Sequence, residues 1–217
     1  MEGGEGSGKS TQALHLRKYF KNKGYRVRIV QEPGETRIGR KIRKILLNPK
    51  HHEMAAITEV LLYISARAQL VEEIIIPELK RGCVIICDRY IDSSMAYQGI
   101  GRGLGLKTVG LLNSIAIQGK IPDITFYFDL NPEIGLVRKY KSTHGKMDRM
   151  ESESRKFHQK IRKCYLQLAK KESKRIQIIQ ANRPAEKIWN LVKEKIDKYL
   201  FISKVFYIKN SIIFFIR

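Results

Sequence analysis

Apolar and polar residues alternate along this chain in blocks that predict helices and strands in turn. Apolar positions at helical spacing predict helices over residues 9–23, 58–82, 151–171 and 184–200. Short β-branched or aromatic runs predict strands over residues 25–30, 83–87, 124–130 and 175–180. Because helices separate the successive strands, the pattern indicates a single α/β domain whose parallel sheet is covered on both faces.

Two of these elements carry further local signals. The strand over 83–87 reads CVIIC and is continuously apolar, so we expect it to be buried on both faces. The long helix over 58–82 contains Pro77 and stops at Gly82. Proline removes a backbone donor and glycine favours a helix stop, so we expect a bend near Pro77 and an end at Gly82.

Charge adds a preference for anionic ligands. The chain has 42 Lys and Arg against 21 Asp and Glu, a formal net charge of +21. Such a surplus attracts polyanions or phosphate-bearing ligands. It is spread from Arg17 to Arg217 and is not gathered in a stripe with interleaved aromatics. We therefore favour compositional drift and local phosphate chemistry over nucleic-acid binding. No apolar run is long enough to suggest a membrane span.

The cysteines indicate a reducing compartment. Cys83, Cys87 and Cys164 form no CxxC pair and are too few for a disulfide framework. We expect them to pack in the core. With no signal-peptide pattern at the start of the chain, they predict a cytoplasmic location.

The opening segment MEGGEGSGKST contains a phosphate-binding motif. Gly3, Gly8, Lys9 and Ser10 match G-x-x-x-x-G-K-S directly before a predicted helix. Glycines let backbone N–H groups curl around phosphate oxygens, and the helix directs its positive end toward them. We expect Lys9 to reach the β- and γ-phosphates of a nucleotide and Ser10 to offer its hydroxyl to Mg²⁺.

Other candidate positions are ambiguous when each is taken alone. Asp88 ends a buried strand, where it either holds Mg²⁺ or is an ordinary strand-end residue, and Arg89 either grips a phosphate or forms a surface ion pair. Tyr63 and Arg67 share a helical face, either to hold a base or as core and rim. The five histidines lack metal-ligand spacing, so we predict no zinc site.

Taken together, these motifs resemble the thymidylate kinase family. The segments EGGEGSGKST, EPGET, DRYIDSSMAYQGIGRG, PDITFYFDL and DRMESES occur in the family's order, and the likeness runs from Glu2 to about Leu200. It implies a P-loop fold with one parallel sheet of order 2-3-1-4-5. It also implies transfer of phosphate from ATP to dTMP with Mg²⁺, by a cytoplasmic homodimer.

The resemblance assigns roles to individual residues. The phosphate loop for ATP comprises Gly3, Gly4, Glu5, Gly6, Ser7, Gly8, Lys9, Ser10 and Thr11. The dTMP site comprises Glu5, Glu32, Arg43, Tyr63, Arg67, Arg89, Ser94, Tyr97 and Gln98. The positions linked to Mg²⁺ are Ser10, Asp88, Asp148 and Glu151. The catalytic set comprises Lys9, Arg89, Arg149 and Glu5, with a lid over about residues 138–152.

Three departures from the family pattern bear on these roles. The phosphate loop has no arginine, which points to a lid arginine, yet His144-Gly145 stands where Arg-Gly is usual. Arg138 and Arg149 both remain candidates for that cation. Glu35 replaces a second glycine, and Gln31 replaces a common arginine, so we expect an added negative charge near the acceptor side.

The two ends of the chain are also unusual. The family's first strand is a short apolar run before the loop, and here only two residues precede Gly3. We expect that strand to be absent and hypothesise a natural start a few codons upstream. Residues 201–217 look like an addition to a domain over 1–200, and a less favoured alternative makes SIIFFI a replacement strand.

Two further functional readings stay open. One is a nucleoside-monophosphate kinase with another acceptor, which the Tyr63 and Arg67 pair disfavours. The other is a degraded, non-catalytic protein that binds nucleotides or nucleic acid, suggested by the altered lid and the net charge.

Overall fold

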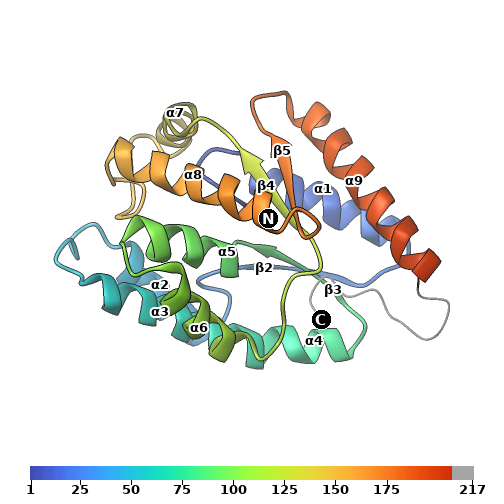
Figure 1. Ribbon diagram of the computed structural model, residues 1–217, viewed down its shortest axis with the longest axis horizontal. Helices are drawn as coiled ribbons and strands as arrows, with labels where there is room; N and C mark the ends of the chain where they lie inside the picture. Colours follow the sequence, from blue (N-terminus) through green and yellow to red (C-terminus); the bar gives the residue numbers. More distant parts are fainter. Residues whose placement is uncertain (207–217) are drawn as a thin grey trace.

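The computed structural model describes residues 1–206, and these form a layered α/β fold (Figure 1). The strands are β1 (Glu2–Gly3), β2 (Val27–Gln31), β3 (Val84–Asp88), β4 (Thr125–Asp129) and β5 (Ile176–Gln180). The helices are α1 (Lys9–Asn22), α2 (Arg37–Leu47), α3 (Ala56–Leu70), α4 (Ile76–Lys80), α5 (Ile91–Ser94), α6 (Leu106–Ile117), α7 (Pro132–Ser142), α8 (Arg155–Lys171) and α9 (Ala185–Phe206). Two π-helical segments, η1 (Val71–Ile75) and η2 (Met95–Gly101), follow α3 and α5.

The strands form two parallel sheets and not the one that we predicted. One sheet has the order β1-β4-β5 and the other pairs β2 with β3. Two backbone hydrogen bonds bridge them: Arg89 N donates to Met1 O at 3.0 Å, and the Met1 amino group donates to Cys87 O at 2.8 Å. The expected order 2-3-1-4-5 is thus divided at the contact between Met1 and the end of β3.

The prediction that the first strand is absent is wrong. Glu2 and Gly3 pair in parallel with Tyr127 and Phe128 of β4, so two residues of that strand are present. Two residues cannot show the alternation or apolar run that identifies a strand in a sequence. The pairing is made by backbone groups, which the sequence pattern does not reveal.

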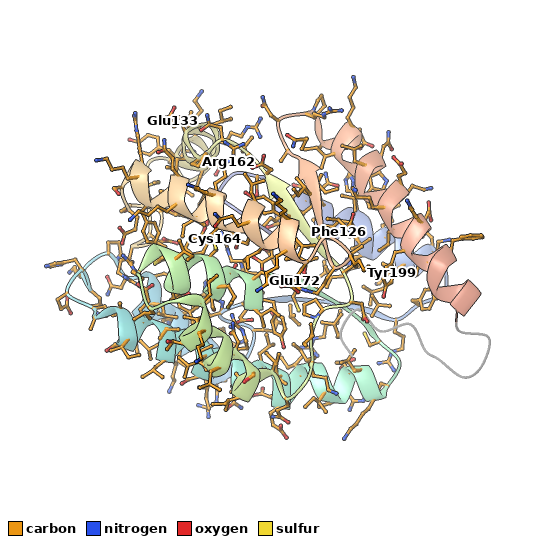
Figure 2. All side chains as sticks on the ribbon, viewed as in Figure 1. Phe126, Glu133, Arg162, Cys164, Glu172 and Tyr199 are labelled. Carbon is orange, nitrogen blue, oxygen red and sulfur yellow. The ribbon has the colours of Figure 1, made fainter. Side chains whose placement is uncertain are left out.

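The strands alternate their side chains between two core layers. Val84 and Ile86 pack with α1 and α9, whereas Ile85 and Cys87 face the helices before and after η1. This confirms burial of CVIIC on both faces. Figure 1 shows α9 beside β5 and α8 on the other side of β4 and β5. Arg162 of α8, labelled in Figure 2, holds that helix to β4 through hydrogen bonds of 2.7 and 3.0 Å to Asp129.

The predicted helices are present with changed limits, and four other α-helices of residues 1–206 were not predicted. The long helix over 58–82 becomes α3, η1 and α4, which ends at Lys80, and the bend expected near Pro77 stays a prediction. Pro77 lies in the first turn of α4, where a missing N–H costs least. Helices α2, α5, α6 and α7 and the π-helical η2 were not identified from the sequence. α9 continues to Phe206, past the expected domain limit at Leu200, and the alternative strand SIIFFI lies outside the described residues.

The three cysteines lie in the core, as predicted. Cys83, Cys87 and Cys164 are free and buried, and Cys164 is labelled on α8 in Figure 2. Within residues 1–206, no helix combines the length and apolar character that a bilayer crossing requires.

The carboxylate of Glu2 fixes β1 against the segment after β3. Glu2 is 1 % exposed. Its oxygens accept hydrogen bonds from Tyr90 N at 2.7 Å, Ser93 N at 3.3 Å, Ser93 Oγ at 2.6 Å and Tyr165 Oη at 2.8 Å. One side chain therefore joins β1, α5 and α8.

We expect Glu2→Ala to lower the free energy of unfolding by about 3 kcal/mol, because these buried donors lose their acceptor. Urea denaturation measures the change. Glu194→Ala, which removes an exposed carboxylate on α9, is the control and should stay within about 0.5 kcal/mol of the parent. A loss below about 1 kcal/mol for Glu2→Ala would contradict the role given to this carboxylate.

Candidate active site

The glycine-rich segment between β1 and α1 borders a cavity of about 480 Å³. Gly6 has φ 64°, and a Cβ there would lie 2.2 Å from Gly135 O, so a side chain does not fit. Gly8 is left-handed, with φ 86°, and turns the chain into α1. Among the described residues, no side chain caps the first turn of α1. Its backbone N–H groups therefore remain available to an anion.

Lys9 is held in place by backbone carbonyl groups of the glycine-rich loop. Its Nζ donates to Gly3 O at 3.1 Å and to Gly4 O at 2.8 Å, and the side chain lines the cavity. Burial, followed by the charge of Arg89, lowers the pKa of Lys9 to about 8. The ammonium is thus positioned where it gains most from an incoming negative charge.

Ser10 and Asp88 meet at the carboxyl end of β3. Ser10 Oγ donates to Asp88 Oδ2 at 2.8 Å, and both residues line the cavity. The carboxyl ends of parallel strands lie at one edge of a sheet, where ligands bind in open α/β folds. The fold thus brings Ser10 of α1 and Asp88 of β3 together there, although they are 78 residues apart in the sequence.

Arg89 follows Asp88 in a left-handed conformation with φ 69°. Its guanidinium forms an ion pair with Glu5 and lies over the Tyr97 ring at 5.3 Å from the centroid. Burial alone would raise the pKa of Glu5, but Arg89 and then Lys9 outweigh it and lower the pKa to about 2. The loop carboxylate is therefore ionised across the neutral range.

The far side of the same cavity carries aromatic and polar side chains. Those predicted for the acceptor and found in the lining are Glu32, Arg43, Tyr63, Ser94, Tyr97 and Gln98. Arg43 Nη1 donates to Pro33 O at 2.7 Å. Tyr97 and Gln98 lie on η2, and π-helical turns of this kind are frequent at functional sites.

The predicted lid forms the remaining wall. Arg138, Lys139 and Ser142 of α7 line the cavity, together with Asp148, Met150 and Glu151. Asp148 Oδ1 accepts from Glu151 N at 2.9 Å, and Glu151 Oε2 accepts from Asp148 N at 3.0 Å. Lys139 Nζ lies 3.1 Å from Glu151 Oε1. Both lid carboxylates thus already have partners within the protein.

Comparison with known proteins agrees with this arrangement. A sequence model of the family described as thymidylate kinase matches residues 1–192. The chain belongs to the thymidylate kinase family. The thymidylate kinase of Geobacillus sp. strain WCH70 is 45 % identical over 189 residues, 87 % of this chain and 90 % of that protein. That of Caldanaerobacter subterraneus subsp. tengcongensis is 43 % identical over 205 residues, 94 % of this chain and 97 % of that protein.

A solved structure supports the same assignment. The crystal structure of thymidylate kinase from Ehrlichia chaffeensis matches with a TM-score of 0.72 and 29 % identity. The match covers 90 % of this chain and 95 % of that one. The fold of the chain is therefore that of a thymidylate kinase.

Arg67 and Tyr63 do not share one environment. Tyr63 lines the cavity, whereas Arg67 is 1 % exposed and lies outside the lining. Arg67 Nη2 lies 2.5 Å from Glu32 Oε1 and donates to Tyr90 O at 3.1 Å. Here Arg67 holds Glu32 and the start of α5 in place, and its contact with a base stays a prediction.

Arg149 likewise points away from the cavity lining. Its Nε donates to Leu46 O at 2.7 Å and its Nη1 to Glu59 Oε2 at 2.7 Å, so it fastens the lid to α2 and α3. Arg138 and Lys139 are the lid cations in the lining. The transfer role expected for Arg149 stays a prediction.

The departures from the family pattern have clear positions. Glu35 Oε1 lies 3.7 Å from Arg28 Nη2, and Glu35 is not in the cavity lining. Its charge therefore faces Arg28 and not the acceptor side that we expected. Gln31 does line the cavity. His144 is exposed in a left-handed turn, with φ 50°, after α7.

Sequence reasoning missed three supporting residues of this thymidylate kinase site. Glu2 and Ser93 bond to each other and to the segment that carries Arg89, and Arg89 Nη1 also donates to Ser93 Oγ at 3.4 Å. Glu59 is a fully buried carboxylate on α3. A signal for Glu59 exists, because it stands one turn before Tyr63 on an otherwise apolar helix face.

We expect the KM for ATP to rise about tenfold or more between about pH 7 and pH 9.5, because the free enzyme's Lys9 loses its charge through a pKa near 8. An ordinary lysine titrates near 10.5. The turnover number at saturating ATP should change less, since bound phosphates keep the ammonium protonated. Steady-state kinetics across this range measure both.

Lys9→Arg is the control for that pH effect. A guanidinium stays charged throughout the range, so the variant should be less active but have a KM for ATP that is independent of pH. A flat KM in the parent enzyme up to pH 9.5 would contradict the lowered pKa of Lys9.

Proposed function

We propose that this chain transfers the γ-phosphoryl group of ATP to dTMP, giving ADP and dTDP for dTTP synthesis. One observation carries the proposal: a single cavity joins the phosphate loop to the cluster of Arg89, Tyr63 and Gln98. A triphosphate at one end and a monophosphate nucleotide at the other would meet within it. The names of the relatives support the choice of dTMP.

The reaction needs positioning and charge neutralisation more than covalent help. A phosphate oxygen of dTMP attacks the γ-phosphorus in line, and the bond from that phosphorus to the bridging oxygen of ADP breaks. Lys9 and the N–H groups of the loop bind the donor phosphates. Arg89, with Arg43 in the same cavity lining, binds the acceptor phosphate bidentately and directs its oxygen. That phosphate is ionised at neutral pH, so no strong general base is required.

The base and sugar are recognised farther along the cavity. Tyr63 offers an aromatic face to thymine, and Gln98 offers an amide to its hydrogen-bonding edge. Ser94 and Tyr97 border the sugar, where Tyr97 leaves little room for a 2′-hydroxyl. Glu5, ionised beside Arg89, accepts from the 3′-hydroxyl.

Mg²⁺ is the cofactor that this site fits. Ser10 and Asp88 present a hydroxyl and a carboxylate within 2.8 Å of each other beside the loop. Magnesium ions in kinases are held by one or two such groups together with phosphates and water. Within residues 1–206, no group of three or more His, Cys, Asp or Glu is arranged to hold a metal. When bound, the ion neutralises charge on the phosphate oxygens. A contribution from Asp148 and Glu151 would require release of their mutual hydrogen bonds.

Arg138 and Lys139 are the lid cations that we propose for the transferring phosphate, because they line the cavity. Lid residues also exclude water, which would otherwise accept the phosphoryl group. The free, buried cysteines are the basis for proposing a reducing, cytoplasmic location.

A coupled assay of ADP release with Mg-ATP tests the function. We expect fast turnover with dTMP and slow or absent turnover with dUMP, dCMP and UMP. Lys9→Ala is the control for contaminating kinases and should lose nearly all dTMP turnover. Turnover with a different acceptor alone would favour another monophosphate kinase. No turnover above the rate without acceptor, with salt-sensitive DNA binding, would favour a non-catalytic binding protein.

We also propose that two copies pair through α3 and α6. Ile57 and Leu61 on α3 and Leu111 and Ile115 on α6 are 46 % to 69 % exposed, and the two helices pack side by side. Exposed apolar side chains on two adjacent helices are typical of a subunit interface.

Ile115→Glu should therefore convert the dimer to monomers, because it places a charge in the proposed apolar interface. Analytical ultracentrifugation measures the mass. Leu14→Glu, at an exposed apolar position of α1, is the matched control and should leave the dimer intact. A parent protein that sediments as a monomer, or equal effects of the two variants, would overturn the proposed interface.

A further inference from the structure

Glu59 is a buried carboxylate outside the cavity lining that accepts a hydrogen bond from Gln98, which lines the cavity. Glu59 of α3 is 0 % exposed. Its Oε1 accepts from Gln98 Nε2 at 2.8 Å and from Arg102 Nε at 3.1 Å. Its Oε2 accepts from Arg102 Nη2 at 2.9 Å and from Arg149 Nη1 at 2.7 Å. Glu59 therefore joins η2, the segment after it and the lid.

The chemistry of this contact fixes the direction of the Gln98 amide. An amide side chain has one end that donates and one end that accepts, and the two ends look alike in shape. An ionised carboxylate can only accept. Burial alone would raise the pKa of Glu59, but hydrogen bonds from Arg102 and then Gln98 outweigh it and lower the pKa. The NH₂ end of Gln98 must therefore face Glu59, which leaves the oxygen end for the cavity.

The direction of that amide matters for base choice. Thymine carries an N3–H donor between two carbonyl oxygens, whereas N3 of cytosine has a lone pair and no hydrogen. An amide oxygen directed at N3 is attracted to thymine and repelled by cytosine. A polar site built for one hydrogen-bonding pattern rejects the other strongly, because its buried group is left unpaired.

We propose that Glu59 is a specificity-determining positioning residue that holds Gln98 with its oxygen toward the base and so favours thymine over cytosine. This inference rests on the proposed dTMP kinase function. Glu59 acts through Gln98 and does not itself line the cavity. The same carboxylate anchors Arg149, so base selection and lid placement share one buried support.

Glu59→Gln gives the sharpest test, because the shape is kept and one acceptor oxygen becomes a donor. The oxygen of the new side chain should turn to Arg102 and Arg149, since their charged donors otherwise lose their acceptor. Its NH₂ end then faces Gln98, which must reverse and present its own NH₂ end to the base. The site would change from an acceptor to a donor at N3.

We expect kcat/KM for dTMP to fall about tenfold or more, mainly through KM, and the ratio of kcat/KM for dTMP over dCMP to fall on the order of 100-fold. The measurement is steady-state kinetics with both acceptors, with calorimetric binding of dTMP and dCMP as a readout that needs no turnover. Glu53→Gln, at an exposed position shortly before α3, is the matched control and should keep the parent ratio.

Glu59→Asp separates base selection from folding. It keeps the negative charge beside the arginines but withdraws it from Gln98 by one methylene. We expect thermal stability closer to that of the parent than for Glu59→Gln, and a ratio of dTMP over dCMP that is still reduced. This variant carries the test if Glu59→Gln does not fold.

Two outcomes would overturn the inference. One is an equal loss of kcat/KM for dTMP and dCMP in the folded Glu59 variants, which would leave Glu59 a structural role alone. The other is an unchanged ratio in both variants. Failure of the proposed function has a different signature, because the parent and Glu53→Gln would then neither convert nor bind dTMP, and the inference would fall with it.

Discussion

The placement of this site depends on the carboxylate of Glu2, which ties the start of the phosphate loop to the start of α5. Its hydrogen bonds to Tyr90, Ser93 and Tyr165 hold three segments that are far apart in the sequence. Arg89 lies between Asp88 and Tyr90, so its left-handed backbone is fixed from both sides. The distance between the glycine-rich loop and Arg89 is thereby set by one buried side chain.

Several other buried carboxylates of the fold each face at least one arginine. Glu32 faces Arg67, Glu59 faces Arg102 and Arg149, and Asp129 faces Arg162. Removing an ionised group from water is costly unless partners replace the lost hydration. Because each acid faces an arginine from another element, these pairs help to determine which element lies against which. They specify the geometry of the site more than they add to stability.

The sequence predicted the parts of this molecule that depend on local pattern. Backbone conformation and apolar periodicity are local properties, so the sequence predicted the loop from Gly3 to Ser10, the strand at CVIIC and the long helix. Helix α2 was not predicted, since a segment with so many basic residues is also typical of an exposed loop. Its start depends on Thr36, whose Oγ1 accepts from Gly39 N at 2.9 Å.

Residue roles were harder to predict than elements, because they depend on which way a long side chain turns. Arg67 and Arg149 are arginines in recognised motifs, yet in this structure both guanidiniums bind buried acids and backbone carbonyls. Glu35 was expected to affect the acceptor side and instead faces Arg28. A sequence motif fixes the Cα position of such residues, whereas the partners that orient them come from distant elements.

The π-helical segment η2 gives the proposed acceptor site an unusual sensitivity to chain length. Tyr97 and Gln98 lie within a turn that holds one residue more than an α-helical turn. Loss of a single residue there would restore α-helical winding and rotate each later side chain of η2 by about 100° about the helix axis. Substitutions along η2 change one contact at a time, whereas a single-codon deletion would redirect the side chains proposed to bind the base. A change in the length of η2 therefore disturbs this chain far more than a substitution within it.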